Sequence, residues 1–490
     1  MTTRNALDPR DFAKLYLNGE YVAAKSTETY SLNNPKNNTL AVDKIPIAGA
    51  EDIDAAVSYA EAAFHGPWSQ FTAIQRTECF IKLASLLDEE LMPILALDSL
   101  TSGIPLSLAP TREKTYIRNC VIYYAGWTDK QKGDYFPADD GFVKLVRHEP
   151  LGVCAAVNPY NSPVACLFLK AMPALATGNV MIVKPSEKTP LGTVAIASLF
   201  AKAGFPPGVL QVVTGPGSTG ALLAEHMRIR KISFTGSIAT GKRIQTAAAN
   251  SNLKRVTLEL GGKSPAVIFD DANLENAVNW TVNGILARSG QLCVAASRVY
   301  VQRGIASAFI EAYTKRMAAA VDDIGDPQDL NVKYGPIVDK GQLERIKGMV
   351  DRAKADAELV VGGGQLPGTI GNYMQPTVFL NPKNDSEIYR NEVFGPVSII
   401  KTFDTEEEVT KAANDTEFGL MAGVFTKDIT RAMRMSSAID SGVVGINCVS
   451  LQSLQAPFGG KKQSGVGREF GEYALRLFTE PKTVLINMAA

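Results

Sequence analysis

The sequence contains few of the residues that bind metals or form disulfides. Its 490 residues include three histidines, which lie far apart at His65, His148 and His226. Six cysteines occur, and even the two nearest, Cys154 and Cys166, are too far apart for a Cys-x-x-Cys pair. Reduced thiols in a cytosolic protein are a better interpretation than a disulfide scaffold. We therefore predict no metal site.

Neither charge nor hydrophobicity is concentrated in one region. Lys and Arg number 50, as do Asp and Glu, which argues against a nucleic-acid partner or a basic membrane-binding face. No apolar run approaches the roughly 20 residues of a membrane span. The start, Met1–Pro9, has no apolar stretch typical of a signal peptide, and the tail, 487–490, carries no retention or peroxisomal signal. We expect a soluble cytoplasmic protein that contacts neither membrane nor nucleic acid.

The first half of the chain changes from helical to alternating patterns. Amphipathic stretches predict helices near 53–64, 72–91 and 112–128. From Leu151, apolar segments predict strands at 151–157, 180–183, 209–213 and 231–235, with helices at 164–176, 191–203 and after 239. Strands that alternate with helices indicate a parallel sheet covered on both faces, in a doubly wound nucleotide-binding architecture.

The alternation restarts near Leu260. Strands are expected at 266–269 and 299–301, with a helix at 274–288 between them. We interpret Glu259 to about Gly445 as a second α/β domain. At roughly 100–200 residues per domain, the length allows two such domains and a smaller part.

Two glycine-containing turns are candidates for binding an anion. Gly215-Pro-Gly217-Ser-Thr-Gly220 fits GxGxxG, but no acidic residue follows at the spacing that would hold a ribose, which favours an ordinary turn that at most borders a cofactor. Phe234-Thr-Gly236-Ser237 stands where a strand ends and a helix begins, and the backbone N–H groups there suit an anion.

Three further motifs each allow two interpretations. Lys184-Pro-Ser-Glu187 closes a strand and could bind ribose hydroxyls or form a surface charge pair. Gly290-Gln-Leu-Cys293 places a thiol in a turn after a helix, although a free cysteine is more often an inert buried residue. Glu259, in Leu-Glu-Leu-Gly-Gly, is a candidate base if its apolar surroundings raise its pKa, or a solvent-facing residue if they do not.

Taken together and in order, these motifs resemble the aldehyde dehydrogenase superfamily from about residue 12 to 488. The matching segments are Asn158-Pro-Tyr-Asn161-Ser-Pro, Lys184-Pro-Ser-Glu187, Phe234-Thr-Gly236-Ser237, Leu258-Glu259-Leu-Gly-Gly-Lys, Gly290-Gln-Leu-Cys293, Glu392-Val-Phe394-Gly-Pro and Pro457-Phe458-Gly-Gly. The resemblance implies a Rossmann-like NAD-binding domain (1–126 and 148–258), an α/β catalytic domain (259–456) and a small β oligomerisation arm (127–147 and 470–490). A homodimer or homotetramer is implied.

The resemblance also implies the chemistry. Cys293 would attack an aldehyde, Asn161 and the Cys293 backbone N–H would hold the oxyanion, and Glu259 would activate the water that hydrolyses the thioester. Lys170 and Glu469 match positions beside that base, as a proton exit. The residues assigned to NAD are Lys184 and Glu187 at the adenosine ribose, Gly236 and Ser237 at the pyrophosphate, Glu392 at the nicotinamide ribose and Phe394 beside the ring.

The chain departs from the family around the substrate. The resemblance assigns the pocket walls to Ser162, Cys166, Leu169, Leu292, Val294 and Phe458. Many relatives carry an aromatic residue where Ser162 stands, so we expect room for a bulky or long apolar aldehyde. Arg288 stands where members usually have Asn, Leu292 is an unusual neighbour of the nucleophile, and Tyr160 replaces a Trp.

Three other functions are open to the same motifs. A thiol hydrolase or acyltransferase would need a His base, and the sequence has none near Cys293. A dehydrogenase fold kept as a structural protein would not require Asn161, Glu259 and Cys293 together. The CoA-acylating branch typically lacks the carboxylate that Glu259 supplies.

Overall fold

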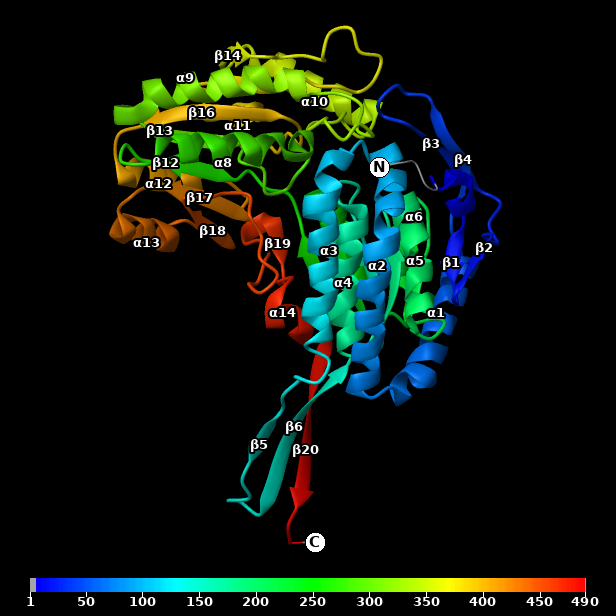
Figure 1. Ribbon diagram of the computed structural model, residues 1–490. Coiled ribbons are helices and arrows are strands. Elements are labelled where there is room, and N and C mark those ends of the chain that lie inside the picture. Colours follow the sequence, from blue (N-terminus) through cyan, green and yellow to red (C-terminus); the bar gives the residue numbers. More distant parts are fainter. Residues whose placement is uncertain (1–5, 490) are drawn as a thin grey trace.

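The computed structural model describes residues 6–489, apart from the side chains of Thr111 and Arg112. Two large sheets with their helices lie side by side, and a narrow three-stranded arm extends from them (Figure 1). The ends of the predicted first domain and arm, Met1–Asn5 and Ala490, lie outside the described residues.

The first sheet is the predicted doubly wound sheet, with short antiparallel strands added at both edges. Its parallel centre follows the order β11, β10, β7, β8, β9; the last four strands lie close to their predicted positions, whereas β11 was not predicted. These strands are β7 (Val153–Val157), β8 (Val180–Lys184), β9 (Leu210–Val212), β10 (Lys231–Thr235) and β11 (Arg255–Glu259). The edges are β1 (Leu15–Leu17) with β2 (Glu20–Val22), and β19 (Gly465–Val466). Strands this short show no period-two pattern, so the sequence did not predict them.

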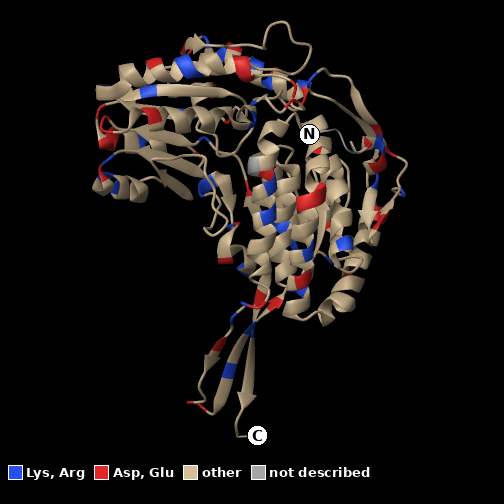
Figure 2. Cartoon of the chain, viewed as in Figure 1, with Lys and Arg blue, Asp and Glu red and all other residues tan. Residues whose placement is uncertain are grey.

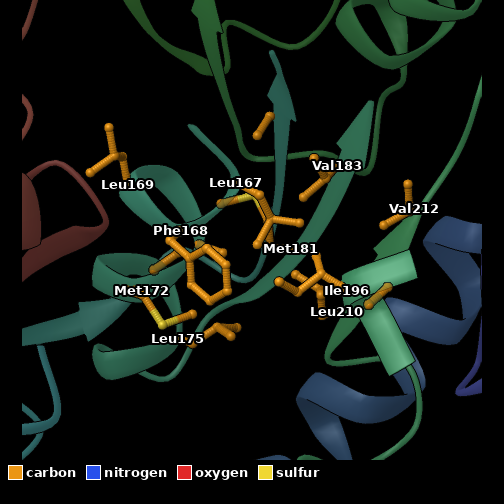
Figure 3. Close-up of a cluster of buried hydrophobic side chains, with 14 of the residues drawn as sticks. Leu167, Phe168, Leu169, Met172, Leu175, Met181, Val183, Ile196, Leu210 and Val212 are labelled. Carbon is orange, nitrogen blue, oxygen red and sulfur yellow. The ribbon is translucent and has the colours of Figure 1, made fainter. Parts of the chain in front are cut away.

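The helices of this half bury apolar faces against the sheet or, like α2 and α3, against other helices. They are α1 (Ala50–His65), α2 (Ala73–Ser102), α3 (Lys114–Ala125), α4 (Pro163–Ala176), α5 (Leu191–Ala203), α6 (Gly217–Glu225) and α7 (Ile238–Asn250). Every residue of α4 is buried, and Figure 3 shows Phe168 and Met172 gathered with Met181 of β8 and Ile196 of α5. Strands β7 and β8 are buried on both faces and read as nearly continuous apolar runs, which is why the sequence located them.

Helix α2 is longer than we predicted. The expected end was near residue 91, but the helix continues past an internal proline, Pro93, and ends at Gly103, which takes the left-handed conformation (φ +72°). Glycine at this position caps the helix without a steric penalty from Cβ.

The second sheet has the order β14-β15-β16-β13-β12-β17-β18 and is parallel except at β14. Its strands are β12 (Pro265–Ile268), β13 (Arg298–Gln302), β14 (Glu358–Val361), β15 (Thr377–Leu380), β16 (Val397–Phe403), β17 (Met421–Phe425) and β18 (Val443–Ile446). Its helices are α8 (Leu274–Leu286), α9 (Arg303–Ala319), α10 (Lys340–Ala353), α11 (Glu387–Arg390), α12 (Glu406–Asn414) and α13 (Ile429–Ala438). Helix α8 ends two residues earlier than predicted, because Arg288 and Ser289 have positive φ.

The arm is an antiparallel sheet of β5 (Asp134–Phe136), β6 (Phe142–Pro150) and β20 (Thr479–Asn487). We predicted a C-terminal part of the arm from residue 470, but residues 470–478 do not join this sheet. Phe470 is fully buried in the first core, and α14 (Gly471–Arg476) contacts α4. The remaining hairpin is β3 (Thr29–Asn33) with β4 (Leu40–Pro46).

Basic and acidic residues are interspersed along the helices of both halves of the chain (Figure 2). Across residues 6–489, none of the helices has the length and apolar character needed to cross a membrane.

Candidate active site

A cleft of about 960 Å³ opens where the carboxyl ends of the first sheet's strands face the second half of the chain. Ligands of doubly wound proteins bind at this edge of the sheet. The cleft brings together residues that are far apart in sequence. Among its lining residues are Asn161, Lys184, Glu187, Gly236, Ser237, Glu259, Cys293, Glu392 and Phe394. The structure therefore gathers in one cavity the predicted nucleophile, base, oxyanion donor and cofactor residues.

The cysteine loop follows α8 through three consecutive left-handed residues. Their φ angles are +51° at Arg288, +54° at Ser289 and +72° at Gly290. Gly290 needs the absence of a side chain, because a Cβ there would collide with the backbone of Gly395. Ser289 Oγ donates to the Gly335 carbonyl over 2.6 Å. The loop is thus fastened to the neighbouring segments, and Cys293 stands at the cleft.

Asn161 is tied to the same loop. It lies in the turn between β7 and α4, and its side-chain Nδ2 donates to the Gln291 carbonyl over 2.7 Å. A side-chain amide carries two N–H donors, so one remains for another acceptor. This bond places a donor next to the segment that carries Cys293.

The thiol of Cys293 is strongly disfavoured as a thiolate. Burial raises its pKa well above the ordinary value, and the negative charges of Glu392 and Glu259 raise it further. Because the thiolate is the nucleophilic form, a base must take the proton when the cysteine reacts.

Glu259 is the last residue of β11, and its carboxyl group is buried. Its Oε2 atom has no hydrogen-bond partner among the described residues. Burial raises its pKa well above the usual range; the charge of Glu469 adds to this, while Lys170 opposes it. A buried carboxyl group with a raised pKa, on the same cleft as a thiol, has the properties of a general base.

Lys170 and Glu469 form an ion pair within electrostatic reach of Glu259. Lys170 lies on α4, is fully buried and also donates to Ser233 Oγ over 2.9 Å. Glu469 is held by two backbone hydrogen bonds of 2.7 Å with Phe458. The pair that the resemblance placed beside the base is therefore present as a connected unit.

The other end of the cleft is built from strand-to-helix turns. Lys184 Nζ is buried, donates to the Pro185 carbonyl over 2.9 Å and lies 3.8 Å from a carboxylate oxygen of Glu187, whose side chain is 43% exposed. Burial lowers the pKa of Lys184 to about 8. Ser237 caps α7, and with Gly236 it presents the start of that helix to the cleft. Gly217 and Gly220 border the cleft, as we expected of their turn.

Glu392 and Phe394 contribute from the second half of the chain. Glu392 Oε1 accepts the Gly262 N–H over 2.9 Å, and burial raises its pKa to about 7. Phe394 has a positive φ of +55°, and its ring lies 5.8 Å from that of Tyr160 in an edge-on arrangement. Non-glycine residues in this conformation cost about 1–3 kcal/mol and concentrate at functional sites.

The predicted substrate pocket departs from expectation at Ser162. Cys166, Leu169, Val294 and Phe458 are buried, while Leu292 and Ser162 are partly buried. The room that the small Ser162 side chain was expected to leave is taken by Arg288, whose guanidinium donates to Ser162 Oγ over 2.6 Å.

Sequence motifs did not identify every residue of the cleft. Gln342 and Arg345, from α10, line it, but an amphipathic surface helix gives no signal for such a role. Asn158 stands inside the motif Asn158-Pro-Tyr-Asn161, which predicted a role only for Asn161; the amide nitrogen and oxygen of Asn158 are buried and lack partners within the described chain.

The aldehyde dehydrogenase family model matches residues 21–484. The chain belongs to the aldehyde dehydrogenase family. It is 41% identical to an aldehyde dehydrogenase of Agaricus bisporus over 97% of this chain and 95% of that protein, and 41% identical to human aldehyde dehydrogenase 1A1 over 98% and 95%. The structure of a Bacillus cereus aldehyde dehydrogenase in complex with NAD+ matches with a TM-score of 0.94 and 40% identity, covering 97% of this chain and 96% of that one. Family membership identifies the chain as an oxidoreductase that acts on aldehydes.

The residues of this family member fit a nucleotide cofactor. The cleft holds buried polar atoms without partners in the described chain, at the amide of Asn158 and at Thr235 Oγ1, directly beside Gly236. Buried polar groups are normally hydrogen-bonded, so these atoms are suited to bind a polar ligand. The start of α7 supplies backbone N–H groups for an anion in the same cavity.

Proposed function

We propose that this chain oxidises an aldehyde to a carboxylic acid with NAD+, through a thiohemiacetal and a thioester on Cys293. The observation that carries the proposal is the single cleft shared by Cys293, Asn161 and Glu259 with the residues suited to a nucleotide. NAD+ supplies the acceptor for the hydride that leaves the aldehyde carbon.

The thiol end performs the bond-making steps. A base takes the proton of Cys293, and the sulfur adds to the aldehyde carbon. The oxygen that becomes negative accepts hydrogen bonds from the Asn161 amide and the Cys293 backbone N–H. Donors that meet a developing oxyanion contribute about 3–4 kcal/mol each. After oxidation, Glu259 takes a proton from water, which attacks the thioester and releases the acid.

The proton from Glu259 leaves through the buried pair behind it. The charge of Glu469 raises the pKa of Glu259, and the charge of Lys170 lowers it. Their ion pair and the contact of Lys170 with Ser233 form a connected set of polar groups in the core.

The cofactor end of the cleft would bind and orient NAD+. Lys184 and Glu187 would hold the adenosine ribose, Gly236 and Ser237 the pyrophosphate, and Glu392 the nicotinamide ribose, with Phe394 beside the ring. The half-exposed carboxylate of Glu187 would repel a 2′-phosphate, which supports NAD+ over NADP+.

The substrate is proposed to be a bulky or long apolar aldehyde, bounded by Cys166, Leu169, Leu292, Val294 and Phe458. Because Arg288 fills the room beside Ser162, the preference among aldehydes should depend on these apolar residues. An added methylene in such a pocket is worth about 1–3 kcal/mol, so efficiency should rise in steps along a series of straight-chain aldehydes. Highest efficiency on acetaldehyde would exclude this preference.

The arm is proposed to assemble a homodimer or homotetramer, with the NAD-binding and catalytic domains divided as the sequence indicated. Large apolar side chains of its strands are exposed in the isolated chain, at Tyr135, Phe136, Leu485 and Ile486. We place the assembled protein in the cytoplasm.

Substitution of the nucleophile tests the proposed function. Cys293→Ala should abolish NADH formation with every aldehyde while NAD+ binding, measured by calorimetry, stays intact. Cys448→Ala, in another partly buried cysteine, is the matched control and should keep wild-type turnover. Turnover that survives in Cys293→Ala, or that is lost in Cys166→Ala instead, would remove Cys293 from its role.

A further inference from the structure

We propose that Arg288 is a positioning residue that holds the oxyanion donor Asn161 against the cysteine loop. The proposal rests on the function proposed above and assigns a role to a residue that the mechanism has not used. Arg288 also stands at a place where the family usually has Asn.

Arg288 and Asn161 are joined by a closed ring of hydrogen bonds. The Arg288 guanidinium donates through Nη1 to the backbone carbonyl of Asn161 and to Ser162 Oγ. The Asn161 side chain donates in turn to the Gln291 carbonyl, over 2.7 Å. Gln291 closes the ring, since its backbone N–H (3.2 Å) and its Nε2 (3.1 Å) both donate to the Arg288 carbonyl. Asn161 is therefore held at its backbone by Arg288 and at its amide by the loop that ends in Cys293.

The guanidinium is itself fixed by Glu113. Its Nη2 donates to a carboxylate oxygen of Glu113, which lies in the turn before α3. Both side chains are largely buried, with 12% and 14% exposed. A guanidinium presents planar, divergent donors, so one group can bind Glu113 with one nitrogen and the Asn161 turn with the other. The pair anchors the catalytic turn to the helical layer of the first domain.

The surroundings of Arg288 leave no room for it to bind a substrate. The adjacent cavity, lined by Asp98, Glu113, Ser162 and Arg288, measures about 20 Å³. That is roughly the space of one water molecule, which excludes an anionic group of an aldehyde as the partner of the guanidinium.

The backbone conformation of the cysteine loop needs support of the kind that the Arg288 side chain gives. Arg288 and Ser289 are both left-handed without being glycine, a conformation that persists only where the surroundings impose it. If Arg288 were shortened, the loop would relax toward ordinary angles. Gln291 would then shift, and the Asn161 amide would lose its place beside the cysteine loop.

A double-mutant cycle with Asn161 tests the proposal. The measurement is the rate of the NADH burst in stopped flow with hexanal and saturating NAD+, because the oxyanion forms before the hydride leaves. Arg288→Asn should slow the burst about 10- to 100-fold, the loss expected from a displacement of about 1 Å. In the Asn161→Ala background, the same substitution should have no further effect. Arg288→Lys, which keeps the charge but not the fork, should recover part of the rate.

Two readouts separate positioning from general damage. Stoichiometric labelling of Cys293 by iodoacetamide and the affinity for NAD+ should both stay at wild-type values in Arg288→Lys and Arg288→Asn. Arg118→Asn is the matched control, because Arg118 pairs with Asp88 over 2.8 Å on the exposed side of α3, and its burst should be unchanged.

Equal slowing by Arg288→Asn with and without Asn161 would overturn the proposal, and so would a wild-type burst in Arg288→Asn. If that variant fails to fold, Arg288→Lys in both backgrounds gives the same comparison. If Asn161→Ala alone leaves the burst unchanged, the oxyanion role of Asn161 fails, and this proposal fails with it. Additive losses from Asn161 and Arg288 would instead refute only the coupling and leave the proposed function in place.

Discussion

The two ends of the cleft are built in opposite ways. At the thiol end, Glu259 is buried and Cys293 is partly buried, and the pKa of each is raised by burial and by negative neighbours. At the adenosine end, Glu187 is half-exposed, and Ser237 caps a helix whose first turn faces the cavity. The thiol end thus makes ionisation of the Cys293 thiol and the Glu259 carboxyl group costly. The adenosine end offers backbone N–H donors and the solvated carboxylate of Glu187.

The difference follows from what each end must do. Binding a pyrophosphate needs only donors that are already aligned, which a strand-to-helix turn supplies with little burial. Proton transfer near neutral pH needs a carboxyl group whose pKa lies well above that of a free glutamate, which burial supplies. Substitutions at the thiol end should therefore have large effects, and those at the adenosine end small ones.

The largest effect is expected at Glu259. Glu259→Gln keeps the shape but cannot accept a proton, so deacylation should slow by about 10²–10⁴-fold. Hydride transfer should still give a burst of NADH near one equivalent per site, followed by a much slower steady state. Intact-protein mass spectrometry should then find the acyl group on Cys293.

The exposed acid Glu407 on α12 provides a matched control, and Glu407→Gln should keep wild-type steady-state turnover. A burst that is itself slow and small in Glu259→Gln would show that Glu259 also deprotonates the thiol. Wild-type steady-state turnover in this variant would take Glu259 out of the mechanism.

The second effect is a shift in the pH profile. The carboxylate form of Glu259 is the base, so the rate of acyl-enzyme hydrolysis should rise with pH through its raised pKa. Glu469 is a cause of that raised value. In Glu469→Gln, Glu259 loses a negatively charged neighbour, so the ionised form of Glu259 is favoured and the pKa of Glu259 falls. The rising limb of the pH profile should therefore move to lower pH.

Rapid-quench measurement of acyl-enzyme decay against pH detects this shift. Glu472→Gln is the matched control, because Glu472 lies nearby in α14 but pairs with Arg476 at the surface. The electrostatic effect of Glu469 on Glu259 would be contradicted if the rising limb stayed at its wild-type pH in Glu469→Gln. It would also be contradicted if Glu472→Gln moved the limb by the same amount.

The smallest effect is expected at the solvated end. A 2′-phosphate would meet the like charge of Glu187, at a cost of about 1 kcal/mol near a surface. Steady-state kinetics should therefore give about fivefold higher efficiency with NAD+ than with NADP+, and Glu187→Gln should narrow the ratio. Equal or better efficiency of the wild type with NADP+ would refute this role of Glu187.

The sequence predicted the central strands and the chemical residues for separate physical reasons. Strands buried on both faces, such as β7 and β8, are nearly continuous apolar runs, and turns such as Phe234–Ser237 stand at strand ends. It did not predict the edge strands β1, β2 and β19, because strands of two or three residues have no readable period. The extension of α2 past Pro93 was missed for a related reason, since packing outweighed the local signal of proline.

By itself, the sequence indicated the family and four of the five central strands of the first sheet, and it predicted Cys293, Glu259 and Asn161 as the reacting groups. The tertiary structure alone decided how those groups are tuned and held. Burial, which depends on segments hundreds of residues away, sets the pKa directions of Cys293 and Glu259. The sequence suggested an open space beside Ser162, but the fold brings Arg288 and Glu113 into it. Contacts between distant segments are absent from any local pattern, because the chain acquires them only when it folds.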